Sequence, residues 1–502
     1  MDSFNLLKRR TTELFNSLPS SLPSLPSLPT GHSGFKGTWE KIQVPPLPRS
    51  GHTANIVSGT VYIFGGETDS PRRPTDNQMH AVILPSSGAQ ADYFAIKPKS
   101  SSTGETEPDP SLPTIVETTI TDDSTEEIPL ASPPTKGKSP SLPNVPSPRV
   151  GHASAVIGTR IFIFGGRSPS SSTPIDEAGR VWIFDTRTSL WSYLSPQPNT
   201  LFPSPRHFHS AVSTPKPNSF TNPPNPHPNP PLAQSQSWQE WARSTAETPD
   251  IGEVAELATD ADSDGYGTLI IAGGILDSDG ETDEVWAFDV RGKTWQRLPS
   301  LPNPAFVPAL ALYKSRLYHY AAGRLEYLEL VVDEFNDKFA TGEEVVLSSR
   351  DGGWKSFPVP NVTQEELLQH GPGERVGARL EAITVGGGRE YLALIQGKTG
   401  KGGGYGDDVY VFQVPSQNMS IASATDTVLG VVKRGKTGEG KWVKVALGPE
   451  DDEDDESAEG PGGRAWIAST TMGELEENGI VVWGGKTDGE KVLGDGWVLR
   501  LG

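Results

Sequence analysis

One phrase recurs along this chain, and a recurring phrase limits the fold more than any bulk property of the sequence does. Residues 48–66 read PRSGHTANIVSGTVYIFGG, and residues 148–166 read PRVGHASAVIGTRIFIFGG. Each copy holds a Pro-Arg pair, a histidine, two short apolar runs and a closing Gly-Gly pair. The Pro-Arg part returns at 205–213 and, in weaker form, at 374–379 and 463–466. The chain is therefore built from repeated units.

The segments that follow each phrase complete the unit. An aromatic-rich run such as RVWIFD (180–185) or EVWAFD (284–289) comes next, and a run led by tryptophan, such as Trp191 or Trp295, follows it. Each run has the length and the β-branched and aromatic content of a strand. Four runs per unit predict a four-stranded antiparallel sheet. Such a sheet buries both of its faces only when several sheets pack radially.

These units resemble kelch repeats, the β-propeller family with this pattern of Gly-Gly, aromatic and tryptophan residues. The resemblance weakens in the fourth unit, where Ala322-Gly323 replaces Gly-Gly and no Pro-Arg pair occurs, and in the fifth, where Gln396-Gly397 replaces it. The segments that carry the resemblance are about 39–97, 146–213, 266–331, 354–414, 442–447 and 463–502.

Counting innermost strands predicts six blades. These strands lie near 50–57, 150–157, 207–213, 306–313, 377–384 and 464–472. A tryptophan-led strand at 38–44 precedes the first Pro-Arg pair, whereas the sixth unit stops at Leu501 and Gly502 without one. We therefore predict an all-β, six-bladed propeller of four-stranded antiparallel blades. In this fold 38–44 joins the last blade as its outermost strand and closes the ring.

The domain organisation follows from the same pattern. We assign residues 1–37 to a flexible N-terminal segment and residues 38–502 to the propeller. Five stretches between the predicted strands lack the strand pattern, and several are rich in Ser, Pro or acidic residues, so we expect disordered or irregular inserts there. These inserts are 98–146, 214–265, 332–353, 415–441 and 448–462.

Composition excludes several classes of function. The chain has no cysteine, so it has no disulfide, no thiolate metal site and no cysteine nucleophile. The kelch-related propeller oxidases use a cysteine–tyrosine crosslink beside copper, and that chemistry is not open to this chain. With 43 basic and 63 acidic residues the net charge is −20, which argues against nucleic acid as a partner. No signal peptide or membrane-spanning stretch is visible. We expect a cytoplasmic protein, with the nucleus as the alternative.

One arginine holds the same position in five of the six units, just before the innermost strand. These residues are Arg49, Arg149, Arg206, Arg375 and Arg464. They are expected to ring one mouth of the central channel, and guanidinium groups bind carboxylates through paired hydrogen bonds. In kelch proteins that recruit partners this face is where ligands dock. We therefore predict that these arginines and His209 bind a partner. The alternative is a structural role, in which they bond carbonyl groups of neighbouring blades.

His52, His152 and His209 each follow an arginine by three residues. Strand alternation and the separation of the blades keep these rings from converging on one ion. We therefore predict hydrogen bonds to the backbone, no metal site and no cofactor.

The function predicted from these features is a non-catalytic kelch-repeat scaffold. It would bind a protein or peptide partner, an acidic one being one class, at the Arg-rimmed mouth, without nucleic acid or membrane. We assign no catalytic residue. The alternative is an enzyme of the isomerase or epimerase type, or a small-molecule binder in a biosynthetic pathway, in which Arg149, Arg206 and His209 hold an anionic substrate. A perturbed acid–base pair in a closed pocket favours the alternative, whereas a broad, open mouth favours the scaffold.

Overall fold

The fold was taken from a computed structural model of the 502-residue chain. The residues that it describes are 35–68, 76–85, 90–101, 144–168, 170–214, 267–277, 280–335, 344–349, 352–357, 371–386, 388–400, 403–415, 440–448 and 460–502. The predicted segment 1–37 lies outside this description up to residue 34, as do most of the predicted inserts. Within the described residues, no helix is long and apolar enough for a membrane span.

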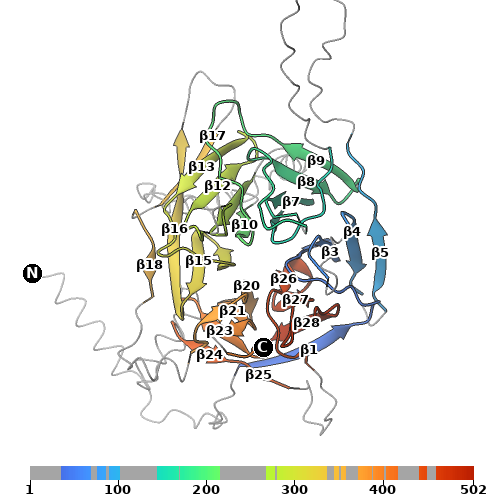
Figure 1. Ribbon diagram of the computed structural model, residues 1–502. Coiled ribbons are helices and arrows are strands. Elements are labelled where there is room, and N and C mark those ends of the chain that lie inside the picture. The colour runs from blue at the N-terminus through green and yellow to red at the C-terminus, as the bar shows by residue number, and fades with distance from the viewer. Residues whose placement is uncertain are drawn as a thin grey trace, which may run out of the picture. The chain divides into compact units, whose positions relative to one another are not determined.

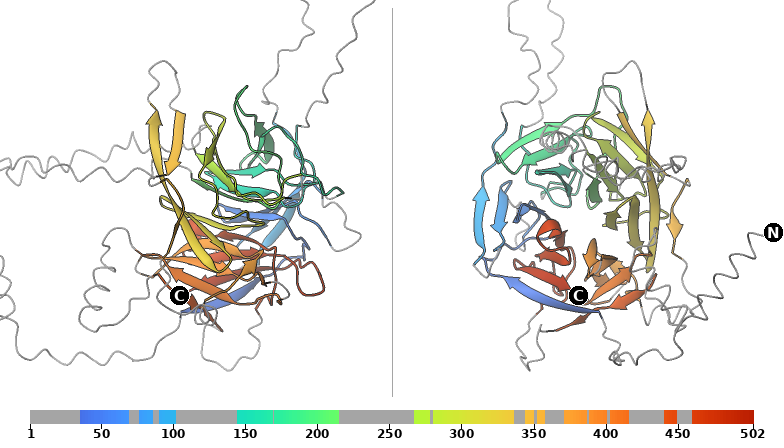
Figure 2. Two further views of the ribbon diagram at one scale, coloured as in Figure 1. Left: turned by 60° about the vertical axis from the view of Figure 1, so that its left-hand side comes forward. Right: turned by 180° about the vertical axis from the view of Figure 1, so that it is seen from behind.

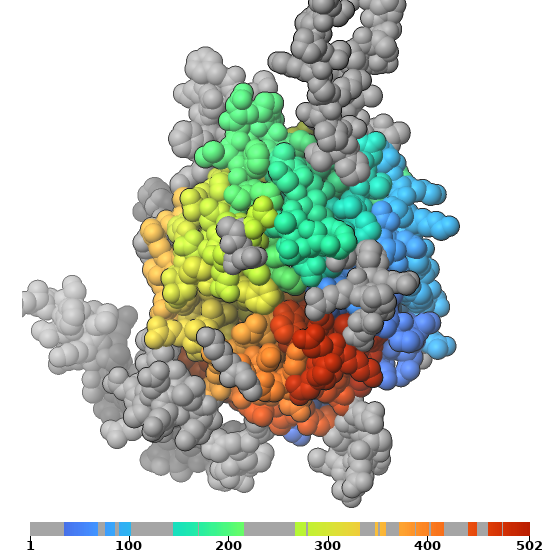
Figure 3. Space-filling model, viewed as in Figure 1, coloured from blue at the N-terminus to red at the C-terminus, as the bar shows by residue number. Residues whose placement is uncertain are grey.

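Six antiparallel sheets follow one another around a central axis in chain order, as Figure 1 shows for the ribbon and Figure 3 for the surface. Blade 1 holds β2 (Thr53–Val57), β3 (Thr60–Phe64), β4 (Met79–Ile83) and β5 (Asp92–Ile96). Blade 2 holds β6 (Ala153–Ile157), β7 (Arg160–Phe164), β8 (Val181–Asp185) and β9 (Leu190–Leu194). Blade 3 holds β10 (Ser210–Thr214), β11 (Thr268–Ala272), β12 (Val285–Asp289) and β13 (Thr294–Leu298).

Blades 4 to 6 carry small additions to this plan. Blade 4 holds β14 (Ala309–Tyr313), β15 (Arg316–Ala321), β16 (Arg324–Phe335) and β18 (Lys355–Ser356). Blade 5 holds β20 (Arg379–Val385), β21 (Arg389–Ile395), β23 (Val409–Gln413) and β24 (Trp442–Lys444). Blade 6 holds β26 (Ala468–Thr471), β27 (Gly479–Trp483), β28 (Gly496–Leu501) and β1 (Lys36–Ile42). The additions are β17 (Glu344–Ser349) on the far half of β16, β25 (Ala446–Leu447) beside β1, a β19 (Arg375–Val376) and β22 (Lys398–Thr399) pair, and the 3₁₀ turn η2 (Gly473–Leu475).

The ring closes as predicted. β1 pairs antiparallel with β28, with Trp39 opposite Leu499, so the first described strand is the outermost strand of the last blade. A hydrophobic cluster that includes Ile42, Val61 and Trp483 then packs blade 6 against blade 1. The six-bladed, all-β propeller predicted from the repeats is therefore confirmed.

Neighbouring blades bury their faces against each other, which explains the continuous apolar strands. All five residues of β11 and of β12 are buried, because the middle strands of a blade are covered on both sides. The tryptophan of the outermost strand fills the wedge next to the preceding blade. Trp191 lies 5.1 Å from Phe64, and Trp295 lies 5.0 Å from Phe164, measured between ring centroids.

The Gly-Gly pairs mark a close approach between blades. Gly65 has a φ of +65°, and a Cβ atom there would lie 2.5 Å from the carbonyl oxygen of Arg149 in blade 2. The next residue, Gly66, donates its backbone N–H to that same oxygen at 2.9 Å. Only glycine combines this backbone conformation with so little space. The pair therefore joins one blade to the next.

The ring has two faces. The Arg-side face is the one on which the chain enters each innermost strand, and it carries the Pro-Arg segments and the loops after Gly-Gly. The hairpin-side face carries the turns between the first and second strands, including η2, which is seen at the inner end of blade 6 in the right-hand panel of Figure 2.

Candidate functional site

Four of the five recurring arginines are buried, and the side chain of the fifth, Arg375, is 5% exposed. Arg149 and Arg206 are fully buried, and Arg49 and Arg464 are no more than 3% exposed. Each guanidinium meets a carboxylate from the loop before the third strand of its own blade. The pairs are Arg49–Asp76 at 3.5 Å, Arg149–Glu177 at 2.9 Å, Arg206–Glu284 at 2.6 Å, Arg375–Asp408 at 2.6 Å and Arg464–Asp495 at 2.8 Å.

Each of these arginines also connects backbone segments. The guanidinium of Arg149 donates to the carbonyl oxygen of Gly165 in its own blade at 3.0 Å, and its own carbonyl accepts the N–H of Gly66 from blade 1. The side chain of Arg206 likewise donates to Gly273, and its carbonyl accepts from Gly166. These contacts favour a structural role, but the guanidinium groups bond carbonyl oxygens of their own blades, and the backbone carbonyl of the arginine makes the link to the neighbouring blade. Partner binding by the five arginines and His209 stays a prediction, because every contact just described is internal to the propeller.

Sequence reasoning missed the acidic partners of these arginines, although a signal was present. In blades 3 and 6 the acid stands two residues before the aromatic residue of the third strand, as in Glu284 and Trp286 or Asp495 and Trp497. The indole N–H of Trp497 donates to Asp495 at 2.6 Å. Burial disfavours the ionised form of Asp495, but the hydrogen bonds from Arg464 and Trp497 outweigh burial and leave its pKa below the usual value.

Blade 4 shows why the arginine and the acid occur together. Ala305 occupies the arginine position, since its carbonyl oxygen accepts the N–H of Gly274 as the arginine carbonyls do elsewhere. Only Ala322 and Gly323 separate β15 from β16, so this blade has no loop that could hold a carboxylate. Blade 4 therefore lacks both members of the pair.

The recurring histidines are buried rings packed on the preceding blade. His152 lies edge-on to Phe64 at 5.4 Å, and His209 lies edge-on to Phe164 at 5.6 Å, measured between ring centroids. Burial, with neighbouring arginine charges, lowers the pKa of His52 to about 3 and those of His152 and His209 well below 6.5, so all three are neutral at pH 7. The prediction of a backbone bond is wrong for His152 Nε2, which contacts the Thr53 hydroxyl at 2.9 Å.

No group of three metal-ligating side chains forms within the part of the chain that the structure describes. The rings of His152 and His209 instead occupy separate blade–blade interfaces, each against the aromatic residue that precedes a Gly-Gly pair.

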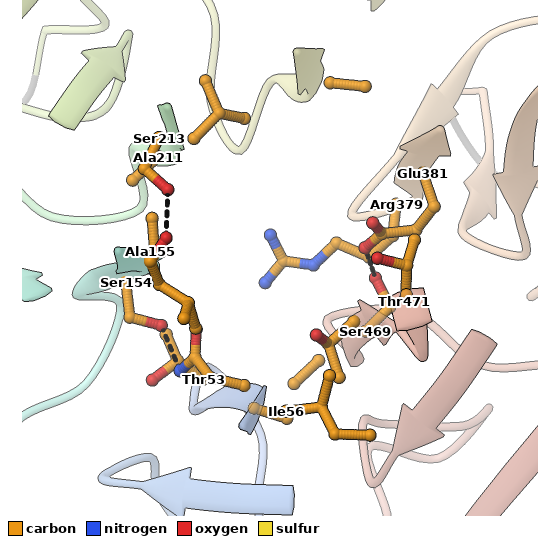
Figure 4. A pocket seen from close by; sticks show the side chains of 18 of the residues that line it. Thr53, Ile56, Ser154, Ala155, Ala211, Ser213, Arg379, Glu381, Ser469 and Thr471 are labelled. Carbon is orange, nitrogen blue, oxygen red and sulfur yellow. Dashed lines mark hydrogen bonds between the residues drawn. The ribbon is translucent and has the colours of Figure 1, made fainter. Parts of the chain in front are cut away.

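A cavity of about 590 Å³ runs along the central axis and is lined by innermost strands. Its lining extends from Thr53, His152 and His209 near the Arg-side face to Met472 and Leu475 on the hairpin-side face. The polar lining is largely paired within the protein. Asn55 donates to the hydroxyl of Ser154, which is labelled in Figure 4, at 2.7 Å.

Two charged residues of β20 face this channel, and the sequence analysis did not single them out. Arg379 extends toward the middle of the cavity, while Glu381 accepts a hydrogen bond from Ser469 of blade 6 (Figure 4). Burial lowers the pKa of Arg379 and raises that of Glu381, with the two opposite charges partly offsetting these shifts. The signal in the sequence was a charged residue at alternate positions of an innermost strand.

The Arg-side face also exposes apolar side chains. Leu201 is 79% exposed and Phe202 is 42% exposed, in the loop that leads from blade 2 into blade 3. Phe202 packs on Gly179, in the loop that leads into β8 on the same face. Further along the same loop, Phe208 lies 5.2 Å from Phe306 in an edge-to-face contact. Exposed leucine and aromatic side chains of this kind suit a protein partner.

Comparison with known proteins places this architecture in context. The model of the Kelch motif matches residues 148–198, which form most of blade 2. Kelch-like protein terF of Aspergillus terreus is 26% identical over 216 residues, which are 38% of this chain and 44% of that protein. The Rab9 effector protein with kelch motifs of Homo sapiens is 41% identical over 71 residues, which are 14% of this chain and 18% of that protein.

Each match therefore spans less than half of the relative's length. Among solved structures, that of YjhT superposes with a TM-score of 0.44 at 13% identity, over 92% of this chain and 99% of that one. The Kelch-motif match in blade 2, the kelch proteins among its relatives and the six four-stranded blades together support a kelch-repeat β-propeller.

Proposed function

We propose that this propeller is a non-catalytic scaffold that binds a protein or peptide partner on its Arg-side face. The observation that carries the proposal is the exposed Leu201–Phe202 pair, which projects from that face although the blades bury most other large apolar residues. A Rab9 effector is among the relatives, and its name describes a protein that acts through another protein.

In this proposal the partner contacts the exposed loops beside the arginines and not the arginine side chains themselves. Arg149, Arg206, Arg375 and Arg464 pair with carboxylates that are buried or partly buried, and freeing one of these guanidinium groups for an external ligand would leave such a carboxylate unpaired. Exposed apolar side chains carry no such cost, and a leucine or an aromatic ring buried by a partner contributes about 1.5–3 kcal/mol. The arginines shape the face, and the loops between them make the contact.

The test compares the partners captured from the source cell by the wild type and by a Leu201→Ser, Phe202→Ser double variant. The matched control is Leu475→Ser, which removes a 54% exposed leucine from the hairpin-side face. Thermal unfolding establishes that all three proteins fold. The proposal expects partners that the double variant loses and the control keeps. Equal capture by all three proteins would contradict it.

A small-molecule function is the second candidate, and the charged pair Arg379 and Glu381 in the central channel favours it. A perturbed acid–base pair in a closed pocket would favour this candidate, and the channel holds such a pair although it opens on the hairpin-side face.

A further inference from the structure

The innermost strands have a repeated register, which shows that Arg379 breaks the symmetry of the channel. In five blades the first residue of the innermost strand pairs with the residue just before the Gly-Gly position, and in blade 4 Ala309, four residues after the arginine-equivalent Ala305, pairs with Tyr320. Thr53 pairs with Phe64, Ala468 pairs with Trp483, and Arg379 pairs with Ile395. At this position the other five blades carry only small residues, namely Thr53, Ala153, Ser210, Ala309 and Ala468.

The contacts of these positions confirm the equivalence. Asn55 of blade 1 donates to Ser154 of blade 2, and at the equivalent positions Glu381 of blade 5 accepts from Ser469 of blade 6. Thr53 contacts His152 in the next blade, and the Nε of Arg379 donates to the carbonyl of Ile467 in the next blade at 2.9 Å. Arg379 therefore makes the contact expected of its position and has a longer side chain left over.

The remainder of that side chain lies in the channel. Its Nη1 and Nη2 atoms extend toward the cavity centre (Figure 4) and have no hydrogen-bond partner among the described residues. A guanidinium carries donors on both of these nitrogens, in a fork that matches two carboxylate oxygens. The charge of Glu381 partly offsets that of Arg379, but donors without an acceptor in a buried site remain costly until a ligand supplies the acceptor.

The titratable groups that line the cavity or lie in its wall determine which charge a ligand bound to Arg379 can carry. His52, His152 and His209 are neutral at pH 7, and Glu381 is the one described carboxylate of the lining. Glu381 disfavours a dianion, whereas a monoanion needs only the hydrogen-bond donors of Arg379, the one arginine among the described lining residues. The hydroxyl groups of Ser469 and Ser213 are already engaged, with Glu381 and with the Val156 carbonyl, so the guanidinium is the dominant recognition group.

We propose that the central channel binds a small organic monocarboxylate, whose two oxygens accept hydrogen bonds from Nη1 and Nη2 of Arg379. The cavity volume of about 590 Å³ falls within the range of small-molecule sites. Access is from the hairpin-side face, because the lining reaches η2, while Phe208 packs over Gly151 beyond the Arg-side end. This site is separate from the partner contact at Leu201 and Phe202 and does not depend on it.

The test is isothermal titration calorimetry of the full chain with benzoate, and in parallel with inorganic phosphate, at constant ionic strength in chloride buffer. Wild type is expected to bind benzoate more tightly than phosphate. Arg379→Gln is expected to weaken benzoate binding by about tenfold to a hundredfold, which is the range for a lost charge-assisted hydrogen-bond pair. Arg389→Gln, an exposed arginine on the second strand of the same blade, is the matched control and should leave affinity unchanged.

Two further variants keep the proposal open to refutation if Arg379→Gln does not fold. Arg379→Lys keeps the charge but loses the fork, and should bind benzoate more weakly than wild type. Glu381→Gln removes the neighbouring charge and still accepts from Ser469, so it should bind benzoate more tightly. Absence of benzoate binding to the wild type, tighter binding of phosphate, or equal benzoate affinity in the wild type and a folded Arg379 variant would each overturn the proposal.

Discussion

The pair Arg149 and Glu177 provides the sharpest test of the structural role of the recurring arginines. Arg149 is fully buried, and it donates to both oxygens of Glu177 at 2.9 and 3.0 Å. Glu177 also accepts from the indole of Trp182 at 2.9 Å. Glu177→Ala leaves a buried guanidinium without its counter-charge, which lowers the free energy of unfolding by about 3–5 kcal/mol. Arg149→Ala leaves the carboxylate unpaired and costs a similar amount.

The double variant Arg149→Ala, Glu177→Ala tests whether the two residues act as a pair or contribute independently to stability. When both charges are removed together no buried charge is left unpaired, so the double variant should cost about as much as either single variant. The resulting coupling free energy is about 3 kcal/mol. Urea unfolding followed by tryptophan fluorescence measures all three values. Arg160→Ala is the control in the same blade, because its ion pair with Asp185 is partly exposed and is worth about 1 kcal/mol or less. A loss below about 1 kcal/mol for Arg149→Ala would refute the reasoning.

Three further predictions concern the fold. Gly65→Ala should lower the free energy of unfolding by about 2 kcal/mol or more, because the new Cβ would meet a backbone oxygen at 2.5 Å. Gly489 has a similar positive φ with open space around it, so Gly489→Ala should lower that free energy by only about 1 kcal/mol. Equal losses in the two variants would contradict this. The free energy of unfolding should fall as the pH drops from 6.5 toward 4, by about 1.4 kcal/mol per pH unit for each histidine whose pKa is strongly lowered in the folded state, such as His52. The reason is that the unfolded state binds protons that the folded state excludes. Urea unfolding at pH 7, 6 and 5 measures this slope, and a flat profile would contradict it. Removing residues 1–44 should expose the edge of β28 and produce aggregation or dimerisation in size-exclusion chromatography, whereas a monomer of unchanged stability would show that β1 does not close the ring.

The fold could be predicted from the sequence because its signals are local and repeated. The Gly-Gly pairs, the aromatic third strands and Trp191 or Trp295 each mark one element, and six copies reinforce one another. Ring closure could be predicted from a count of strands at the two ends of the chain. The strand boundaries differ only slightly, since the predicted strand 38–44 forms as Lys36–Ile42.

The candidate site could be predicted only in part, because side-chain direction depends on the packing between blades. The position of Arg149 and its equivalents in the repeat was correct, but the sequence did not show that their guanidinium groups turn into the blades and toward acids. Glu177 lies 28 residues from Arg149, so no local spacing joins them. Arg379 was overlooked because it stands in a degraded copy of the repeat, and only the ring of six strands shows that its five counterparts are small.

The most direct test of the proposed function is site-specific photo-crosslinking from the Arg-side face in the source cell. A photoreactive phenylalanine analogue at Phe202 would be compared with the same analogue at Leu475 on the hairpin-side face, both of which are exposed. We expect a specific protein crosslinked at position 202 and absent from position 475. No crosslinked protein at position 202, or the same products from both positions, would contradict a scaffold that binds its partner on the Arg-side face.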